Sequence, residues 1–188
     1  MPLRPFSVER EHWLAQTPEL SRIEIEIGPG NCGFLIEAAR RQPDTLFVGI
    51  EIRAASPARA ARRGELPANL RMLCTDARWM VSHLLAAQTI DAYHVYFPDP
   101  WWKKRHHKRR LFTPEFCQAV HRTLRPGGRI YVATDVTPAF GEIRQRLTES
   151  GLAEEPWRGR ADDPACSAYE KKYRAQARQI HQAAFAKP

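Results

Sequence analysis

The chain has 188 residues, of which 43% are hydrophobic and 27% are charged, a composition typical of one soluble globular domain rather than of a disordered chain. Its formal net charge of +8 reflects 29 Lys and Arg against 21 Asp and Glu, which favours a polyanionic partner. The sequence has no apolar run of membrane-spanning length and no apolar core of a signal peptide at its beginning, so we expect a cytoplasmic protein that is not inserted in a membrane. The four cysteines form no C-x-x-C pair, so we expect neither a metal site nor a disulfide framework.

Short apolar or β-branched runs recur along the chain and predict β-strands, separated by longer stretches of helical pattern. In chain order the expected strands are Ile23–Ile27, Leu46–Ile52, Leu70–Cys74, Ala92–Phe97 and Arg129–Thr134. Alternating strands and helices pack as a parallel sheet that is covered on both faces. We therefore expect an α/β fold that binds its ligands beyond the carboxyl ends of the strands.

Three helices are expected to begin where a hydroxyl residue precedes proline. In each pair the hydroxyl can cap the first turn, and proline suits the first helical position. The pairs are Ser56-Pro57, Thr113-Pro114 and Thr137-Pro138. The segment Leu124–Gly128 is expected to end the helix from Thr113 and to turn into the next strand.

A glycine-rich turn follows the first expected strand. Gly28, Gly30 and Gly33 match the spacing G-x-G-x-x-G, and Glu51 ends the second strand, where an acidic residue can accept hydrogen bonds from ribose hydroxyls. Glycine lets the backbone turn sharply and approach a ligand. The motif alone fits a dinucleotide site and a methyltransferase site equally well.

Carboxylates at the other strand ends favour a cationic ligand. Glu26, Asp76 and Asp99 would surround it, and such a ring repels a pyrophosphate but attracts a sulfonium with an ammonium group. Glu24, on the same strand face as Glu26, is expected at the solvent edge. No tyrosine has lysine four residues later, which excludes the catalytic pair of short-chain dehydrogenases.

A basic run begins four residues after Asp99. Residues 103–110 read Lys-Lys-Arg-His-His-Lys-Arg-Arg and hold six of the chain's Lys and Arg side chains. Because the run comes after an aromatic, proline-rich turn, contact with a polyanion is favoured over a solvated loop. His106 and His107 have no third metal ligand nearby in the sequence.

The segment from Phe97 to Leu111, which reads FPDPWWKKRHHKRRL, resembles the signature of the bacterial tRNA guanine-N7 methyltransferase family. Further matches occur in family order from the first strand to the end of the chain. They are Glu26-Ile27-Gly28, Gly49-Ile50-Glu51, Asp76-Ala77, Ala133-Thr134-Asp135 and Ser167-Ala168-Tyr169-Glu170. The chain departs from the family pattern at Cys32, Trp102, Ala168 and Ala177.

The resemblance implies a Rossmann-like class I S-adenosylmethionine-dependent methyltransferase fold, with a mostly parallel seven-stranded sheet and helices on both faces. A single domain would extend over residues 1–188, with 1–21 as a short N-terminal extension. It implies a break near Ala177 and a last strand at about residues 179–186, where local propensity alone favours one long helix. The implied partner is tRNA, methylated at N7 of a variable-loop guanine, and the enzyme would be a monomer or homodimer.

The resemblance also implies a role for each matching residue. The residues implied to bind S-adenosyl-L-methionine are Glu26, Gly28, Gly30, Glu51, Asp76, Ala77 and Asp99, of which Asp99 is also the catalytic position. The residues implied to contact the substrate are Lys103, Asp135, Ser167, Tyr169 and Glu170. The residues implied to grip RNA phosphates are Arg105, Lys108, Arg109 and Arg110. Two alternatives stay open: another RNA or small-molecule methyltransferase, and an RNA-binding relative that has lost catalysis.

Overall fold

The structure of the chain is a computed structural model, and it describes residues 20–53, 65–99, 110–157, 172–173 and 175–188. The elements are β1 (Arg22–Ile27), α2 (Gly33–Arg41), β2 (Thr45–Glu51), β3 (Leu70–Cys74), α4 (Ala77–Trp79), the π-helical segment η1 (Met80–Leu84), β4 (Ile90–Tyr96), α5 (Pro114–Thr123), β5 (Leu124–Thr134), α6 (Thr137–Glu149), β6 (Ala153–Glu155) and β7 (His181–Ala186). No helix in this part of the chain is both long and apolar enough to span a bilayer.

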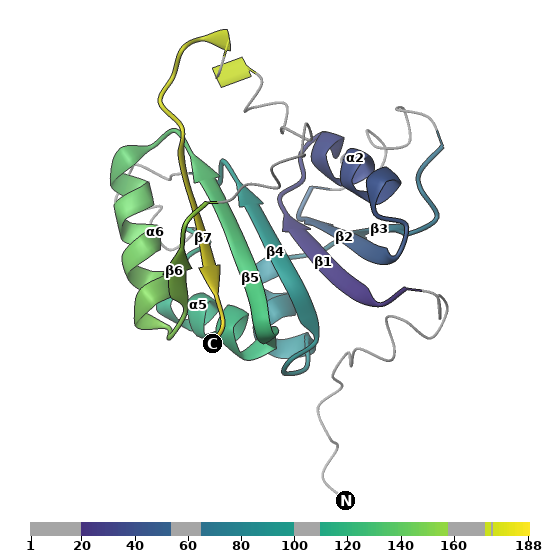
Figure 1. Cartoon of the computed structure of the whole chain (residues 1–188), viewed down its shortest axis with the longest axis horizontal. Helices are drawn as coiled ribbons and strands as arrows, with labels where there is room; N and C mark the ends of the chain where they lie inside the picture. Colours follow the sequence, from purple (N-terminus) through teal and green to yellow (C-terminus); the bar gives the residue numbers. More distant parts are fainter. Residues whose placement is uncertain (1–19, 54–64, 100–109, 158–171, 174) are drawn as a thin grey trace, which may run out of the picture.

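The described strands form one seven-stranded sheet in the order β3-β2-β1-β4-β5-β7-β6 (Figure 1). The first five strands in chain order are mutually parallel, whereas β7 runs antiparallel to both β5 and β6. Strand order reverses direction between β1 and β4, which is where open α/β sheets bind ligands. The expected mostly parallel seven-stranded sheet is confirmed.

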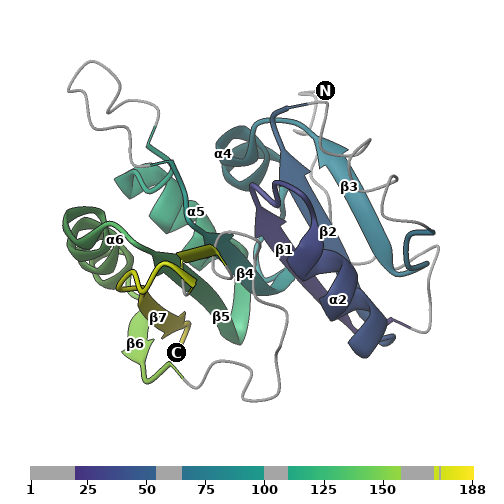
Figure 2. The same ribbon diagram turned by 90° about the horizontal axis from the view of Figure 1, so that it is seen from above.

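Helices cover both faces of this sheet, as Figure 2 shows from above. On one face, α2 packs over β2 and β3 around Phe34, Leu35 and Phe47. The other face carries η1, α5 and α6 and holds the larger core, which includes Ile25 and Val132. Because strand side chains alternate between faces, each central strand supplies apolar side chains to both layers.

The helix beginnings match the expected signals in one of the two described cases. Thr113 caps α5, and its hydroxyl accepts a hydrogen bond from the Phe116 amide at 3.2 Å. The expected cap at Thr137 is wrong: Val136 is the cap residue, and Thr137 is already helical. The Thr137 hydroxyl instead forms a hydrogen bond with Nε2 of His181 at 2.8 Å, which joins α6 to β7. The Ser56-Pro57 signal lies outside the described residues.

The strand boundaries differ most at β5. The strand was expected to begin at Arg129, but Leu124 already pairs with Ile90, and the register then shifts before Ala92. The turn glycines are held by backbone hydrogen bonds between Gly127, Gly128 and Lys187. At the other end of the chain, Ala177 has φ 51° and β7 follows it. The expected break near Ala177 and the expected last strand are therefore confirmed.

Candidate active site at the carboxyl edge of the sheet

The parallel strands end at one edge of the sheet, and the described candidate residues lie along it. Gly28 and Gly30 follow β1, Glu51 ends β2, and Asp76 follows β3. Asp99 and Asp135 follow β4 and β5 in the same way. The fold thus brings residues from five separate sequence segments to one edge, as the sequence predicts.

The turn after β1 requires glycine for its backbone conformation. Gly28 and Gly30 have φ of 72° and 54°, values that side chains on L-residues disfavour. A Cβ atom at either glycine would meet nothing within 4 Å, so space for a ligand remains beside the turn. Cys32 also has positive φ, 58°, and is buried with its Sγ 3.8 Å from Sδ of Met72. Cys32 is one of the positions at which the chain departs from the family pattern, and its small buried side chain fits in this turn.

Glu26 is the buried acid of this site. Its side chain is 3% exposed, and its Oε2 has no hydrogen-bond partner among the described residues. Burial raises the pKa of Glu26 from 4.5 to about 8, because removal from water disfavours the carboxylate. A buried carboxylate oxygen without a partner fits a cationic group, such as the ammonium group of an amino-acid ligand.

Glu51 and Asp76 are both oriented by backbone amides. The Arg53 amide donates to Oε1 of Glu51 at 3.1 Å. The amides of Arg78 and Trp79 donate to Oδ1 of Asp76 at 2.8 Å and 3.3 Å, so Asp76 caps α4. The Asp76 side chain is 41% exposed, and its Oδ2 lies 3.9 Å from Nη2 of Arg78. The next residue, Ala77, is buried.

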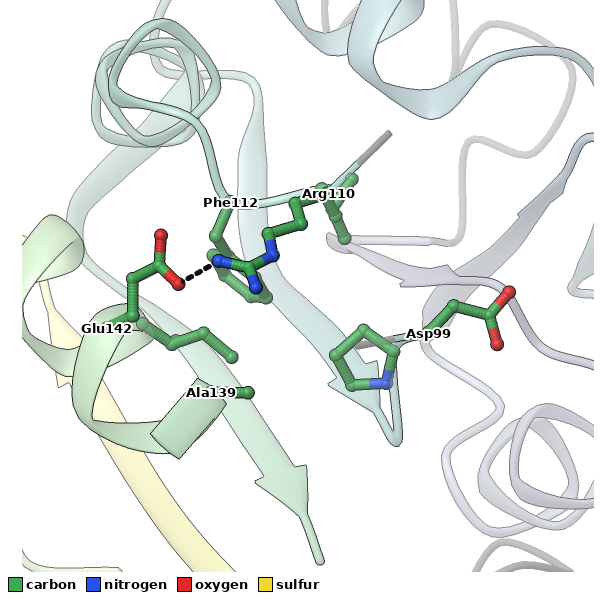
Figure 3. Close-up of a pocket in the computed structure, with 8 residues that line it drawn as sticks. Asp99, Arg110, Phe112, Ala139 and Glu142 are labelled. Carbon is green, nitrogen blue, oxygen red and sulfur yellow. Dashed lines mark hydrogen bonds and ion pairs between the residues drawn. The ribbon is translucent and has the colours of Figure 1, made fainter. Parts of the chain in front are cut away.

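Asp99 lies beside a pocket between the end of β4 and α6. The backbone turns out of the strand at Phe97, which has φ 53° and donates its amide to the Ala133 carbonyl at 2.7 Å. The residues that line the pocket are Pro98, Asp99, Arg110, Leu111, Phe112, Ala139, Glu142 and Ile143. Figure 3 shows the Asp99 carboxylate pointing away from the pocket interior, so the pocket and the carboxylate face different sides of this loop.

Arg110, a residue implied to bind phosphate, is paired within the protein. Its Nη1 lies 2.5 Å from Oε2 of Glu142 on α6 (Figure 3). The other oxygen of Glu142 accepts from Arg146 at 2.6 Å. This ion pair fixes the described end of the basic run against α6.

Asp135 is held by a residue that the sequence did not single out as functional. Nη1 of Arg178 donates to Oδ2 of Asp135 at 2.9 Å, and the Arg178 guanidinium lies 4.7 Å from the ring centre of Tyr173. The Tyr173 ring packs edge-on against Phe97 at 5.2 Å. This group connects the ends of β4 and β5 to the segment before β7.

The expectation that Glu24 lies at the solvent edge is wrong. Its side chain is 1% exposed, and Oε2 lies 2.9 Å from Nε2 of His94, which is equally buried. The partner strand supplies the polar group that permits burial of this acid. No local pattern reveals this pair, because the two residues are 70 positions apart.

The remaining candidates lie outside the described residues. They are Lys103, Arg105, Lys108, Arg109, Ser167, Tyr169 and Glu170. Within the described part of the chain, there is no group of three or more His, Cys, Asp or Glu side chains arranged to hold a metal ion.

Comparison with known proteins identifies relatives over most of the chain. A family model described as "Putative methyltransferase" matches residues 21–183. The tRNA (guanine-N(7)-)-methyltransferase of Rubrobacter xylanophilus is 31% identical over 172 residues, which cover 88% of this chain and 77% of that protein. The enzyme of the same name from Synechococcus sp. (strain JA-2-3B'a(2-13)) is 35% identical over 154 residues, or 80% of this chain and 64% of that protein. A Xanthomonas oryzae pv. oryzae relative of that name is 42% identical over 113 residues, which are 45% of its length.

Solved structures support the fold. The aminoglycoside resistance methyltransferase NpmB1 has a TM-score of 0.63 at 19% identity, with 97% of this chain and 95% of that chain covered. The 16S rRNA methyltransferase KamB has a TM-score of 0.64 at 17% identity, with 98% and 94% covered. The sheet order, the glycine turn and the carboxylate edge agree with this Rossmann-like methyltransferase fold. The chain therefore belongs to the tRNA (guanine-N(7)-)-methyltransferase family of S-adenosyl-L-methionine-dependent enzymes.

Proposed function

We propose that the chain transfers a methyl group from S-adenosyl-L-methionine to N7 of a guanine in the variable loop of tRNA. Family membership supports the reaction. The observation that carries the cofactor site is the buried Glu26 oxygen, which has no hydrogen-bond partner in the described part of the chain and lies at the end of β1 beside the glycine turn. The domain extends over residues 1–188, with 1–21 as an N-terminal extension, and it acts on tRNA in the cytoplasm.

The site holds the two parts of the cofactor by different contacts. Glu26 accepts from the ammonium group, and the Gly28–Gly30 turn leaves room for the methionine chain. Glu51, oriented by the Arg53 amide, accepts from the ribose hydroxyls. Asp76 and Ala77 lie beside the adenine. Each contact to a charged carboxylate contributes about 1.5–3 kcal/mol.

The reaction itself needs alignment rather than proton transfer. S-adenosyl-L-methionine supplies a methyl group on a positively charged sulfur. Guanine N7 carries a lone pair and no proton, so no general base is required. Holding the nucleophile in line can supply roughly 7–11 kcal/mol. Asp99 orients the guanine or the cofactor ammonium by accepting hydrogen bonds, and the proline before it removes a competing amide donor.

The tRNA is held around this centre by a second set of residues. Asp135, in its ion pair with Arg178, faces the target nucleotide from the end of β5. The other residues proposed to contact the target are Lys103, Ser167, Tyr169 and Glu170. The residues proposed to grip phosphates are Arg105, Lys108, Arg109 and Arg110.

Mass mapping of tRNA after incubation with the chain and isotopically labelled cofactor tests the proposal. The expected product is 7-methylguanine at one position in the variable loop. Label at another base or in another RNA indicates a different RNA methyltransferase. Cofactor and tRNA binding without any label indicates a relative that has lost catalysis.

Glu51→Ala is expected to weaken cofactor binding by roughly ten-fold or more, because one or two charge-assisted hydrogen bonds to the ribose are lost. Titration calorimetry with S-adenosylhomocysteine measures this change. Glu37→Ala is the matched control, since Glu37 lies on α2 and pairs with Arg41. An unchanged dissociation constant for Glu51→Ala removes Glu51 from the site.

Asp99→Asn is expected to retain more activity than Asp99→Ala, because an amide oxygen still accepts hydrogen bonds whereas a methyl group does not. The alanine variant should lose about 10- to 100-fold of the rate. Single-turnover rates at saturating tRNA separate the chemical step from binding. Equal loss in both variants means that the charge of Asp99, rather than its hydrogen bonding, is required.

A further inference from the structure

Arg178 and Asp135 form an ion pair where two neighbouring strands meet the site. Nη1 of Arg178 donates to Oδ2 of Asp135 at 2.9 Å. Asp135 follows Thr134, the last residue of β5, and Thr134 pairs with His181, the first residue of β7. The segment before β7, which holds Arg178, therefore lies at the carboxyl edge of the sheet (Figure 1). The proposed function gives Arg178 no contact with the substrate.

The guanidinium of Arg178 is held in a defined plane. Its carbon lies 4.7 Å from the centre of the Tyr173 ring, and that ring packs edge-on against Phe97, just after β4. The Arg178 amide donates to the Tyr173 carbonyl at 3.0 Å, across the turn at Ala177, which has φ 51°. Backbone and ring thus fix the side chain together. A planar guanidinium presents its N–H groups within its own plane.

The pair has hydrogen-bonding capacity to spare at this edge. The Arg178 side chain is 51% exposed and that of Asp135 is 17% exposed. A guanidinium has five N–H donors, and within the described part of the chain one of its nitrogens, Nη1, donates to a side chain. A carboxylate has about four acceptor positions, and Arg178 occupies one of those on Asp135. An N–H donor and a carboxylate acceptor therefore stand side by side.

A donor beside an acceptor matches one edge of guanine. In guanine the O6 acceptor lies beside the N1–H donor, whereas in adenine an amino donor lies beside the N1 acceptor. Arginine often donates to both O6 and N7 of guanine, but such a contact would occupy the N7 lone pair that accepts the methyl group. Recognition through O6 and N1–H, at the edge used in base pairing, leaves N7 open.

We propose that Arg178 is a specificity-determining residue, which donates a hydrogen bond to O6 of the target guanine while Asp135 accepts from its N1–H. This inference rests on the proposed function, in which N7 of a guanine is methylated. The charge of the pair favours a base over a phosphate. Arg178 and Asp135 are together neutral, and a phosphate bound by the arginine would be repelled by the neighbouring carboxylate.

Two tRNAs that differ only at the target base separate this role from a purely structural one. One carries guanine, and the other carries 2-aminopurine, which keeps N7 and the exocyclic amino group but has neither O6 nor N1–H. Arg178→Met keeps an unbranched side chain and removes its donors. It should lower the rate of guanine methylation roughly 10- to 100-fold and that of 2-aminopurine methylation by less than about three-fold. Single-turnover rates with labelled cofactor give both values, and their ratio within one protein does not depend on its folded fraction.

Asp135→Asn tests the other half of the same pair. The amide oxygen should stay with the Arg178 guanidinium, which needs an acceptor, so the amide NH₂ faces the base. A donor at this point opposes N1–H of guanine and suits the N1 acceptor of 2-aminopurine. We expect Asp135→Asn to lower the guanine rate at least roughly 10-fold and to raise the 2-aminopurine rate, so that the preference for guanine falls further than in Arg178→Met.

Arg144→Met is the matched control. Arg144 on α6 is 50% exposed, pairs with Glu154 at 2.7 Å and lies 5.8 Å from the centre of the Phe140 ring, so it has the same kinds of contact at a position that the proposal does not use. Both rates should stay as in the wild type. Equal loss of both rates in Arg178→Met, as for a phosphate contact or a purely structural arginine, overturns the inference alone, and so does an unchanged guanine rate. Failure of the wild-type chain to methylate the target guanine overturns the proposed function with it.

Discussion

Replacement of Glu26 by glutamine is expected to stabilise the cofactor-free chain at pH 8 and, at the same time, to weaken its binding of S-adenosyl-L-methionine. The pKa of Glu26 is about 8 in the folded chain, against 4.5 for an exposed glutamate. Between these pH values the folded state binds a proton that the unfolded state has released. The stabilising contribution of the protonated acid is thus complete below pH 4.5 and is lost as the pH rises toward 8.

The contribution of Glu26 to the unfolding free energy falls by at most about 5 kcal/mol between its unfolded and folded pKa values, because each pKa unit corresponds to about 1.4 kcal/mol. Glutamine exchanges no proton, so the unfolding free energy of Glu26→Gln should be flatter between pH 5 and pH 8. Urea unfolding of both proteins at a series of pH values measures the difference. Glu149→Gln, at an exposed position near the end of α6, is the control. Parallel pH profiles for wild type and Glu26→Gln would contradict the assignment of Glu26 as the buried acid.

Cofactor binding should change in the opposite direction. The wild-type carboxyl releases its proton when the ammonium group binds, so affinity should rise between pH 6 and pH 8. Glutamine accepts a hydrogen bond without a charge, and its affinity should be roughly 10- to 100-fold lower at pH 8 and nearly independent of pH. Calorimetry in two buffers of different ionisation enthalpy detects the released proton. A variant that is both more stable and defective in binding identifies a residue kept for function at a cost in stability.

The fold follows from the sequence where burial dictates the pattern. β3 has the expected bounds, and β1, β2 and β4 differ from expectation by one or two residues at their ends, because apolar periodicity reports which residues face the core. β6 consists of Ala153–Glu155, of which two residues are exposed, and no apolar run marks it. It exists because its backbone pairs with β7, and that pairing is decided by tertiary structure.

The site follows from the sequence only in its outline. Parallel topology alone places Glu51 and Asp99 at one edge, since both follow a strand. Pairings between distant residues are not visible in a local pattern. Glu24 with His94, Asp135 with Arg178, and Arg110 with Glu142 join residues that are 70, 43 and 32 positions apart. In each case a charged residue that the pattern assigns to solvent or ligand has a partner within the protein.

The pairing of Arg110 sharpens the expected behaviour of the basic run. The triple variant with alanine at Arg105, Lys108 and Arg109 is expected to bind tRNA more weakly than the wild type. Each phosphate contact contributes about 0.7–0.9 to the log–log salt slope, so this loss of affinity should be roughly 100- to 500-fold larger at 0.1 M salt than at 1 M salt. Adding Arg110→Ala should flatten the salt slope by less than the contribution of one full phosphate contact, because the Arg110 guanidinium already pairs with Glu142. Affinity for the cofactor should stay unchanged.

Filter binding of labelled tRNA at several salt concentrations measures these slopes. The control removes an equal number of charges from the opposite edge of the sheet, where the strands begin and α2 ends. Suitable positions are Arg40, Arg41 and Arg125. If the control lowers affinity and slope as much as the triple variant, tRNA responds to the net charge of +8 rather than to one surface. If the triple variant binds like wild type, residues 103–110 are a solvated charged segment and the tRNA is held elsewhere. A selective loss in the triple variant, with the cofactor affinity intact, instead separates the grip on phosphates from the site at which the methyl group is transferred.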